Sequence, residues 1–595
     1  MTGDLVFEEP VDLDGALLPY NYLPAALDVL SKAQEPANRV VLLLPGKDGQ
    51  RRSSVRYHIV SQDTLQGAQT APGSENSLAK FLETRGINRE IAYKRCILGP
   101  TSKLPETQAE EAKELVFETF EIANAEQISH VAVIIDIGIA FWNAAFRSTK
   151  GPRFKAMRYL DFDAAPGTPP LQALTEPEIA AICSTADQPG GQDRIVADLG
   201  ARFPDSYFGP DGGAEPGTLW HGSAMADLMA GLPKDAPETT VLMGIELPMA
   251  VLRDADGDTL TAVLVTLIEG ALEMTMAFAD KPLVIALPWG FCAGPQDGSH
   301  PAALAIEHVL ALYPRRDVKL LVAMGNQMQD QCAAHLLPSD PAEPENAVIW
   351  QLPPDDFSAN TLEFSVVANA PVNRQTVRIT APSGQTVVVL IRQSRQVVIR
   401  RGGVIIGIVV RYLDTATGPR SRLTLAPTGW APQTTGPTPA GNWVVSFHHA
   451  DEVRIWVLRD DRDPGLDKAL PRRPSRLFDP NYLSRDNHDA YRLADDKDCA
   501  VIRSGTASVL ASAGSVTSVA ADETLGGGPA LPAWYSGALV SRAPADARAT
   551  VDLGRHNAGI LAAANGTGQM VRVSGTSAAV ALAARGLLSL PARPS

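Results

Sequence analysis

The sequence contains few cysteines and no excess of basic residues. The five cysteines among 595 residues are odd in number and widely scattered, and none of them forms a Cys-x-x-Cys pair. This spacing argues against a disulfide framework or a zinc site and is typical of reduced thiols in a cytoplasm. Lys and Arg number 52 against 67 Asp and Glu, a formal net charge of −15. A nucleic-acid partner is therefore not expected, because such proteins usually present a basic face.

A long apolar run is also missing. The best candidate, VAVIIDIGIAFW at 131–142, contains an acid and is shorter than the roughly 20 residues that a membrane helix needs. The first residues, MTGDLVFEEPVDLDG, lack the basic start and apolar stretch of a secretory signal. We therefore expect a cytoplasmic protein without a membrane partner.

The residue pattern divides the chain into four segments. Residues 1–127 form an N-terminal extension of mixed α/β type, with an apolar strand at 39–45 and an amphipathic helix near 105–125. Over 128–340, short apolar runs alternate with Ala- and Leu-rich helical windows. The apolar runs are HVAVIID (130–136), TVLMGIEL (240–247), KPLVIALPWG (281–290) and VKLLVAMGN (318–326). This alternation predicts a parallel sheet covered by helices on both faces.

Residues 341–475 differ from this α/β pattern. Alternating Val-, Ile- and Thr-rich runs with Gly, Pro and Asn turns predict an all-β sandwich or jelly roll. The α/β pattern returns over 476–595. The simplest layout is one α/β domain that an all-β insertion interrupts.

Three polar positions in the α/β segments have both a structural and a chemical interpretation. Asp136 ends the first buried strand, where it is either a turn cap or part of a site at the sheet edge. His221 opens a helical run beside Gly222 and is either a surface residue or a reactive imidazole. Ser577 follows Gly575-Thr576 and precedes an Ala-rich helix, so it is either a helix cap or a nucleophile.

Asn326 adds a fourth position, at the end of the strand-like stretch 318–326. An asparagine there is either a turn residue with left-handed backbone or a side-chain amide that stabilises an oxyanion.

The order and flanks of these four positions resemble the subtilisin-like serine proteases. The motifs that carry the resemblance are VIIDIGI, HGSAMADLMAG, AMGN and SGTSAA. It covers roughly 128–340 and 480–595 and implies the subtilisin-like α/β fold. It also implies that Ser577 attacks a peptide carbonyl, that His221 transfers the proton, and that Asp136 orients the imidazole. Asn326 and the Ser577 backbone N–H would hold the oxyanion of the acyl-transfer step.

The resemblance also implies a substrate cleft. Pro288, Trp289 and Gly290 would form a short edge that pairs with an extended peptide. Met324 and Gly325 would also bind substrate, and the pocket wall would include Trp289 and Met324. The sequence departs from the family at Ser223-Ala224, where Thr-His is usual, and at Ala581, where proline is usual. Pro288 replaces a common serine and lacks the N–H that could contact substrate. None of these changes removes a reacting atom.

These observations predict a serine endopeptidase that requires no cofactor and takes a polypeptide substrate. A protein partner or regulator would act through the β insertion or the N-terminal extension, which is either an inhibitory pro-segment or a permanent domain. The alternative is a catalytically weak scaffold of the same fold that binds peptides. No metal ligands are expected: the DADGD stretch at 254–258 indicates a turn, and no structural calcium site can be read from the sequence. Trp443 and Trp456 are expected in the β core rather than on a binding platform.

Overall fold

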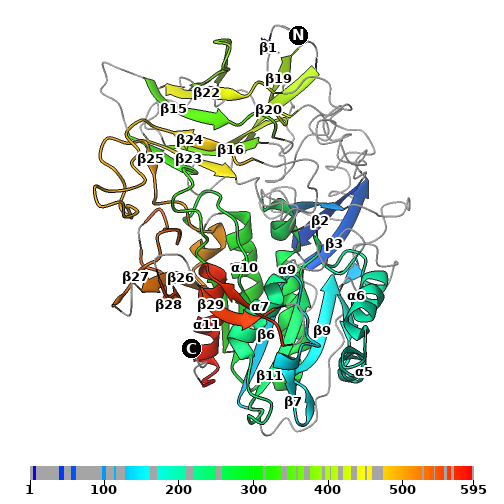
Figure 1. Ribbon diagram of the computed structural model, residues 1–595. Helices are drawn as coiled ribbons and strands as arrows, with labels where there is room; N and C mark the ends of the chain where they lie inside the picture. Colours follow the sequence, from blue (N-terminus) through cyan, green and yellow to red (C-terminus); the bar gives the residue numbers. More distant parts are fainter. Residues whose placement is uncertain are drawn as a thin grey trace.

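The computed structural model (Figure 1) describes residues 128–591 apart from short internal stretches, and within residues 1–127 it describes five strands. The stretches left out are 161–170, 210–219, 250, 252–256, 299, 312–316, 338–344, 357–359, 368–375, 391–395, 402–403, 413–419, 430–437, 449–451, 459–472, 525–527, 542, 555–558 and 565–567.

A nine-stranded, mainly parallel sheet forms the centre of the α/β part. Its order is β10 (Leu171–Leu174), β9 (Phe154–Leu160), β11 (Thr240–Glu246), β6 (His130–Asp136), β12 (Leu283–Leu287), β13 (Val318–Ala323), β26 (Val516–Thr524) and β27 (Ala530–Pro532), with β28 (Ala547–Asp552) also on β26. All neighbours pair in parallel except β10 and β27. The predicted parallel sheet is therefore confirmed.

The burial of β6 explains why its sequence shows no polar alternation. Successive strand residues point to opposite faces of a sheet. Residues 131 to 136 are all buried, with Val131 to Ile135 fully inaccessible, so both faces of the sheet are covered.

Helices at this sheet pack in two pairs. Helix α11 (Thr576–Leu587) packs on α7 (His221–Ala230) and on β12, β13, β26 and β28. Helix α9 (Asp258–Met274) packs on α10 (Pro301–Ala311). Two further helices, α5 (Glu176–Ala186) and α6 (Gly191–Arg202), lie beside each other near β9 (Figure 1). Among the described helices, none is long and apolar enough to cross a membrane.

Two antiparallel sheets form a separate β part, which lies above the α/β part in Figure 1. The eight-stranded sheet has the order β1 (Leu5–Phe7), β19 (Gln396–Arg401), β20 (Val404–Tyr412), β21 (Arg420–Leu425), β16 (Asn360–Val367), β23 (Glu452–Leu458), β14 (Ala333–Leu336) and β25 (Val501–Ile502). The five-stranded sheet has the order β18 (Thr386–Leu390), β17 (Thr376–Thr380), β22 (Gly441–His448), β15 (Glu345–Leu352) and β24 (Arg476–Phe478). Strands β1, β14, β24 and β25 join these sheets from outside the predicted range 341–475.

The two β sheets share one hydrophobic core. Trp350, Trp443 and Trp456 are at most 1% exposed and belong to this core. The prediction that Trp443 and Trp456 are core residues is therefore confirmed.

The N-terminal segment contributes a four-stranded antiparallel sheet in the order β4 (Ile97–Thr101), β2 (Arg39–Pro45), β3 (Val55–Ser61) and β5 (Lys113–Glu114). Strands β2 and β4 lie against α9. The strand predicted at 39–45 is confirmed. The helix predicted near 105–125 is wrong at Lys113–Glu114, because these residues pair with β3. Its other residues lie outside the described ones.

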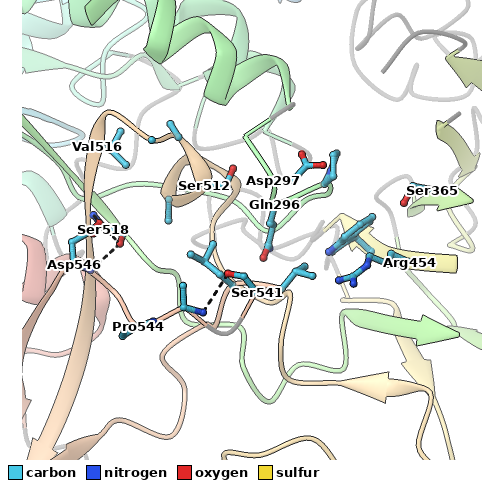
Figure 2. Close-up of a pocket in the computed structure, with 18 residues that line it drawn as sticks. Gln296, Asp297, Ser365, Arg454, Ser512, Val516, Ser518, Ser541, Pro544 and Asp546 are labelled. Carbon is cyan, nitrogen blue, oxygen red and sulfur yellow. Dashed lines mark hydrogen bonds between the residues drawn. The ribbon is translucent and has the colours of Figure 1, made fainter. Parts of the chain in front are cut away.

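A cavity of about 720 Å³ opens where the β part meets the α/β part (Figure 2). Gln296 lines it and donates from Nε2 to the carbonyl oxygens of Gly505 (2.8 Å) and Ala507 (2.6 Å). Near this junction the buried thiols of Cys292 and Cys332 lie 3.6 Å apart, although 40 residues separate them in the chain.

Candidate active site

Asp136 and His221 form a carboxylate–imidazole pair in which the carboxylate is buried and the imidazole is partly exposed. Asp136 is the last residue of β6 and is fully inaccessible. His221 is the first residue of α7, and its Nδ1 lies 2.8 Å from Oδ1 and 2.9 Å from Oδ2 of Asp136. Because an ionised carboxylate can only accept, Nδ1 carries the proton and Nε2 of the neutral ring is an acceptor.

The backbone after Asp136 places α7 at this distance. The carbonyl oxygen of Ile137 accepts from the N–H of Gly222 at 2.7 Å, and that of Gly138 accepts from the N–H of Ser223 at 3.1 Å. Gly222 is required here, because a Cβ would lie 2.8 Å from the Ile137 oxygen and 2.6 Å from the side chain of Ile139. The His-Gly pair noted in the sequence therefore has a packing reason.

Ser577 follows the first residue of α11 and is half-buried. Its hydroxyl donates to the carbonyl oxygen of Pro288 at 2.8 Å, so this hydrogen bond does not go to His221. The next residue, Trp289, contacts the His221 ring edge-on with 5.8 Å between ring centres. Ser577 and His221 thus both lie against the segment Pro288–Trp289.

Asn326 contacts the start of the same helix. Its Oδ1 accepts from both the backbone N–H and the hydroxyl of Thr576, each at 3.0 Å. Gly575, with φ of +95°, lies beside the Asn326 amide: a Cβ there would be 3.1 Å from Nδ2. The structure therefore brings Asn326 to the residue next to Ser577, and it uses Asn326 to cap a helix whose own N-cap is a glycine.

Ser508, which the sequence analysis did not select, lies between the two predicted cleft segments. Its N–H donates to the carbonyl oxygen of Met324 at 2.7 Å. A Cβ on Gly290 would lie 2.3 Å from the Ser508 hydroxyl, and one on Gly325 would lie 3.3 Å from its backbone nitrogen. Pro288, Gly290, Met324 and Gly325 are buried, whereas Trp289 is partly exposed.

Glu246 is a second buried carboxyl that the sequence analysis missed. It ends β11 directly opposite Asp136 on β6 and is 1% exposed. Burial raises its pKa to about 8, although hydrogen bonds from the backbone of Gly138 and Ile139 act in the opposite direction. The signal was present in the sequence: Glu246 ends an apolar strand in the same way as Asp136.

Within the described part of the chain, no group of three or more His, Cys, Asp or Glu residues lies close enough together to hold a metal ion. Most of the DADGD stretch lies outside the described residues, apart from Gly257 and Asp258 at the start of α9.

No protein-family model and no curated protein matches the sequence. Among solved structures, the chain is similar to the CspB protease of Clostridium perfringens. The two folds are similar. The TM-score is 0.51 at 14% sequence identity, and the match covers 78% of this chain and 82% of that one. At this identity the likeness concerns the fold alone.

Proposed function

We propose that the protein is a serine endopeptidase of the subtilisin-like type. The observation that carries this proposal is the arrangement of Asp136, His221, Asn326 and Ser577. Asp136 and His221 form a carboxylate–imidazole pair at 2.8 Å. At the N-terminus of α11, Asn326 binds Thr576, the residue before Ser577. The protease fold of the structural neighbour agrees with this arrangement.

The chemistry follows from the positions of the donors and acceptors. Ser577 Oγ would attack the peptide carbonyl and pass its proton to Nε2 of His221, which would then protonate the leaving amine. Asp136 would stabilise the charged imidazole. The Asn326 amide and the N–H of Ser577, at the positive end of the α11 dipole, would hold the oxyanion. Water would release the acyl group by the same steps in reverse.

Ser577 must turn away from Pro288 before it can act. Rotation about its Cα–Cβ bond moves the hydroxyl among staggered positions without moving α11. Hydrogen bonds between a nucleophile and its base are often long or absent without substrate. A substrate strand or a protein partner that contacts Pro288–Trp289 would favour the rotated hydroxyl.

One observation favours the alternative, a scaffold of this fold that binds peptides with little cleavage. The Ser577 hydroxyl is satisfied by a backbone carbonyl, so the proton that His221 would remove is already engaged elsewhere.

A fluorophosphonate probe distinguishes the two functions, because it reacts only with an activated serine. We expect labelling of the parent and loss of labelling in Ser577→Ala and His221→Ala. Ser574→Ala is the matched control, since Ser574 is exposed and only three residues away. Cleavage of denatured casein should fall by about 10⁶-fold in Ser577→Ala. Equal labelling of the parent and Ser577→Ala would show that another serine reacts, and an unlabelled parent would favour the scaffold.

A further inference from the structure

We propose that Glu246 is a positioning residue that holds His221 against Asp136 through the loop 137–139. This inference rests on the proposed function. Glu246 and Asp136 are the last residues of neighbouring parallel strands and face each other in register. Asp136 contacts the imidazole directly, whereas Glu246 acts on it through the backbone of the loop 137–139.

The first contacts run from Glu246 to the loop. Its Oε1 accepts from the N–H of Gly138 at 2.6 Å, and its Oε2 accepts from the N–H of Ile139 at 3.1 Å. The preceding N–H, of Ile137, donates to Asp136 at 2.7 Å. Three successive backbone donors are thus divided between the two carboxyl groups.

The second contacts run from the loop to α7. The carbonyl oxygens of Ile137 and Gly138 accept from the N–H groups of Gly222 and Ser223. The Ser223 hydroxyl adds a donor to Gly138 and accepts from the N–H of Ala140, each at 2.8 Å. The loop therefore binds Glu246 through its N–H groups and the first turn of α7 through its carbonyl groups.

This arrangement makes the imidazole position depend on Glu246. A buried N–H that loses its acceptor costs about 1–3 kcal/mol, so the loop would shift to recover hydrogen bonds if Glu246 were removed. Because α7 begins at His221 and its first N–H groups are bound to the same loop, such a shift moves the imidazole relative to Asp136.

The charge of Glu246 adds a pH dependence to the positioning. The titratable groups that face it from the neighbouring strands are Asp136 on β6 and Tyr159 on β9, and Arg202 of α6 acts on Tyr159. Tyr207 also lies against Glu246, because its backbone N–H donates to the carboxyl group. Burial raises the pKa of Tyr159 well above its ordinary value, so Tyr159 stays neutral. As pH rises past about 8, Glu246 becomes charged, binds its backbone N–H donors more strongly and stabilises the imidazolium.

The experiment measures the fluorophosphonate labelling rate between pH 6 and 9.5, together with thermal stability, in the parent, Glu246→Gln and Glu363→Gln. Glu363 is the matched control, because it is also 1% exposed but lies in β16 of the β part. Glutamine keeps the size of Glu246 but offers one acceptor oxygen to the N–H groups of Gly138, Ile139 and Tyr207. We expect the Glu246→Gln rate to fall about tenfold and to lose a rise near pH 8 that the parent and Glu363→Gln retain.

An unchanged rate and pH profile in Glu246→Gln would overturn the proposal. If that variant does not fold, the pH profile of the parent tests the proposal: a labelling rate that does not rise near pH 8 contradicts the role of Glu246. If the parent is not labelled at all, the proposed function fails instead. Hydrogen exchange then tests the positioning separately: the amides of Gly138, Ile139 and Gly222 should exchange faster in Glu246→Gln, and equal exchange would refute it.

Discussion

The helix-capping role and the proposed oxyanion role of Asn326 can be separated by two different substitutions of this residue. Its Oδ1 accepts two hydrogen bonds from Thr576 at 3.0 Å, and its amide N–H group is the proposed oxyanion donor. Asn326→Ala removes both functions. Asn326→Asp keeps an oxygen for Thr576 and removes only the donor. Asn326 is exposed, so the added charge is not buried.

The contacts set the expected magnitudes. Thr576 is 1% exposed, so losing two acceptor contacts should lower the free energy of unfolding by about 1–3 kcal/mol in Asn326→Ala. In Asn326→Asp the stability should be unchanged or higher by about 0.3–1 kcal/mol, because a negative charge near a helix N-terminus is favourable. Both variants should lose about 10²–10³-fold in turnover.

Urea denaturation and fluorophosphonate labelling measure the two effects separately. Equal destabilisation of both variants would contradict the capping role of Oδ1. Labelling of Asn326→Asp at the parent rate would contradict the oxyanion role, because a carboxylate cannot donate and would repel the developing charge.

Three further predictions concern other sites. Gly222→Ala should lower the free energy of unfolding by about 1–3 kcal/mol and slow labelling, because its Cβ would lie 2.8 Å from a backbone oxygen. Gly586→Ala is the control: its Cβ would meet no atom within 4 Å, so this variant should be more stable by up to about 1 kcal/mol. With a pKa of about 8, Glu246 keeps a proton that the unfolded chain releases. The free energy of unfolding should therefore fall by up to about 1.4 kcal/mol per pH unit between pH 5 and 8. A denaturation series in which Glu246→Gln keeps this slope would contradict the raised pKa of Glu246. Hydrogen peroxide should join Cys292 to Cys332: one thiol becomes a sulfenic acid with release of water, and the other displaces a second water to form the disulfide. Peptide mapping should then find a cross-linked pair that dithiothreitol separates, and detection of sulfenic acid alone would refute the pairing.

The strands of the parallel sheet were predictable because burial on both faces leaves a continuous apolar run in the sequence. The runs 130–136 and 240–247 correspond to β6 and β11 within one residue. The helix predicted at 105–125 was wrong at Lys113–Glu114. A charged amphipathic pattern does not show that these residues can pair with a strand more than fifty residues away.

In the candidate site, too, some features could be predicted from the sequence and others could not. Asp136, His221, Asn326 and Ser577 stand at element ends with recognisable neighbours, so the sequence by itself was enough to propose them as candidates. Only the tertiary structure decided which groups satisfy them: that Thr576 binds Asn326, that Ser577 binds Pro288, and that Glu246 holds the loop beside Asp136. These partners come from distant segments, and hydrogen bonding depends on distances that arise only when the strands and helices pack. Local sequence patterns specify the elements, but they do not encode which element ends will meet.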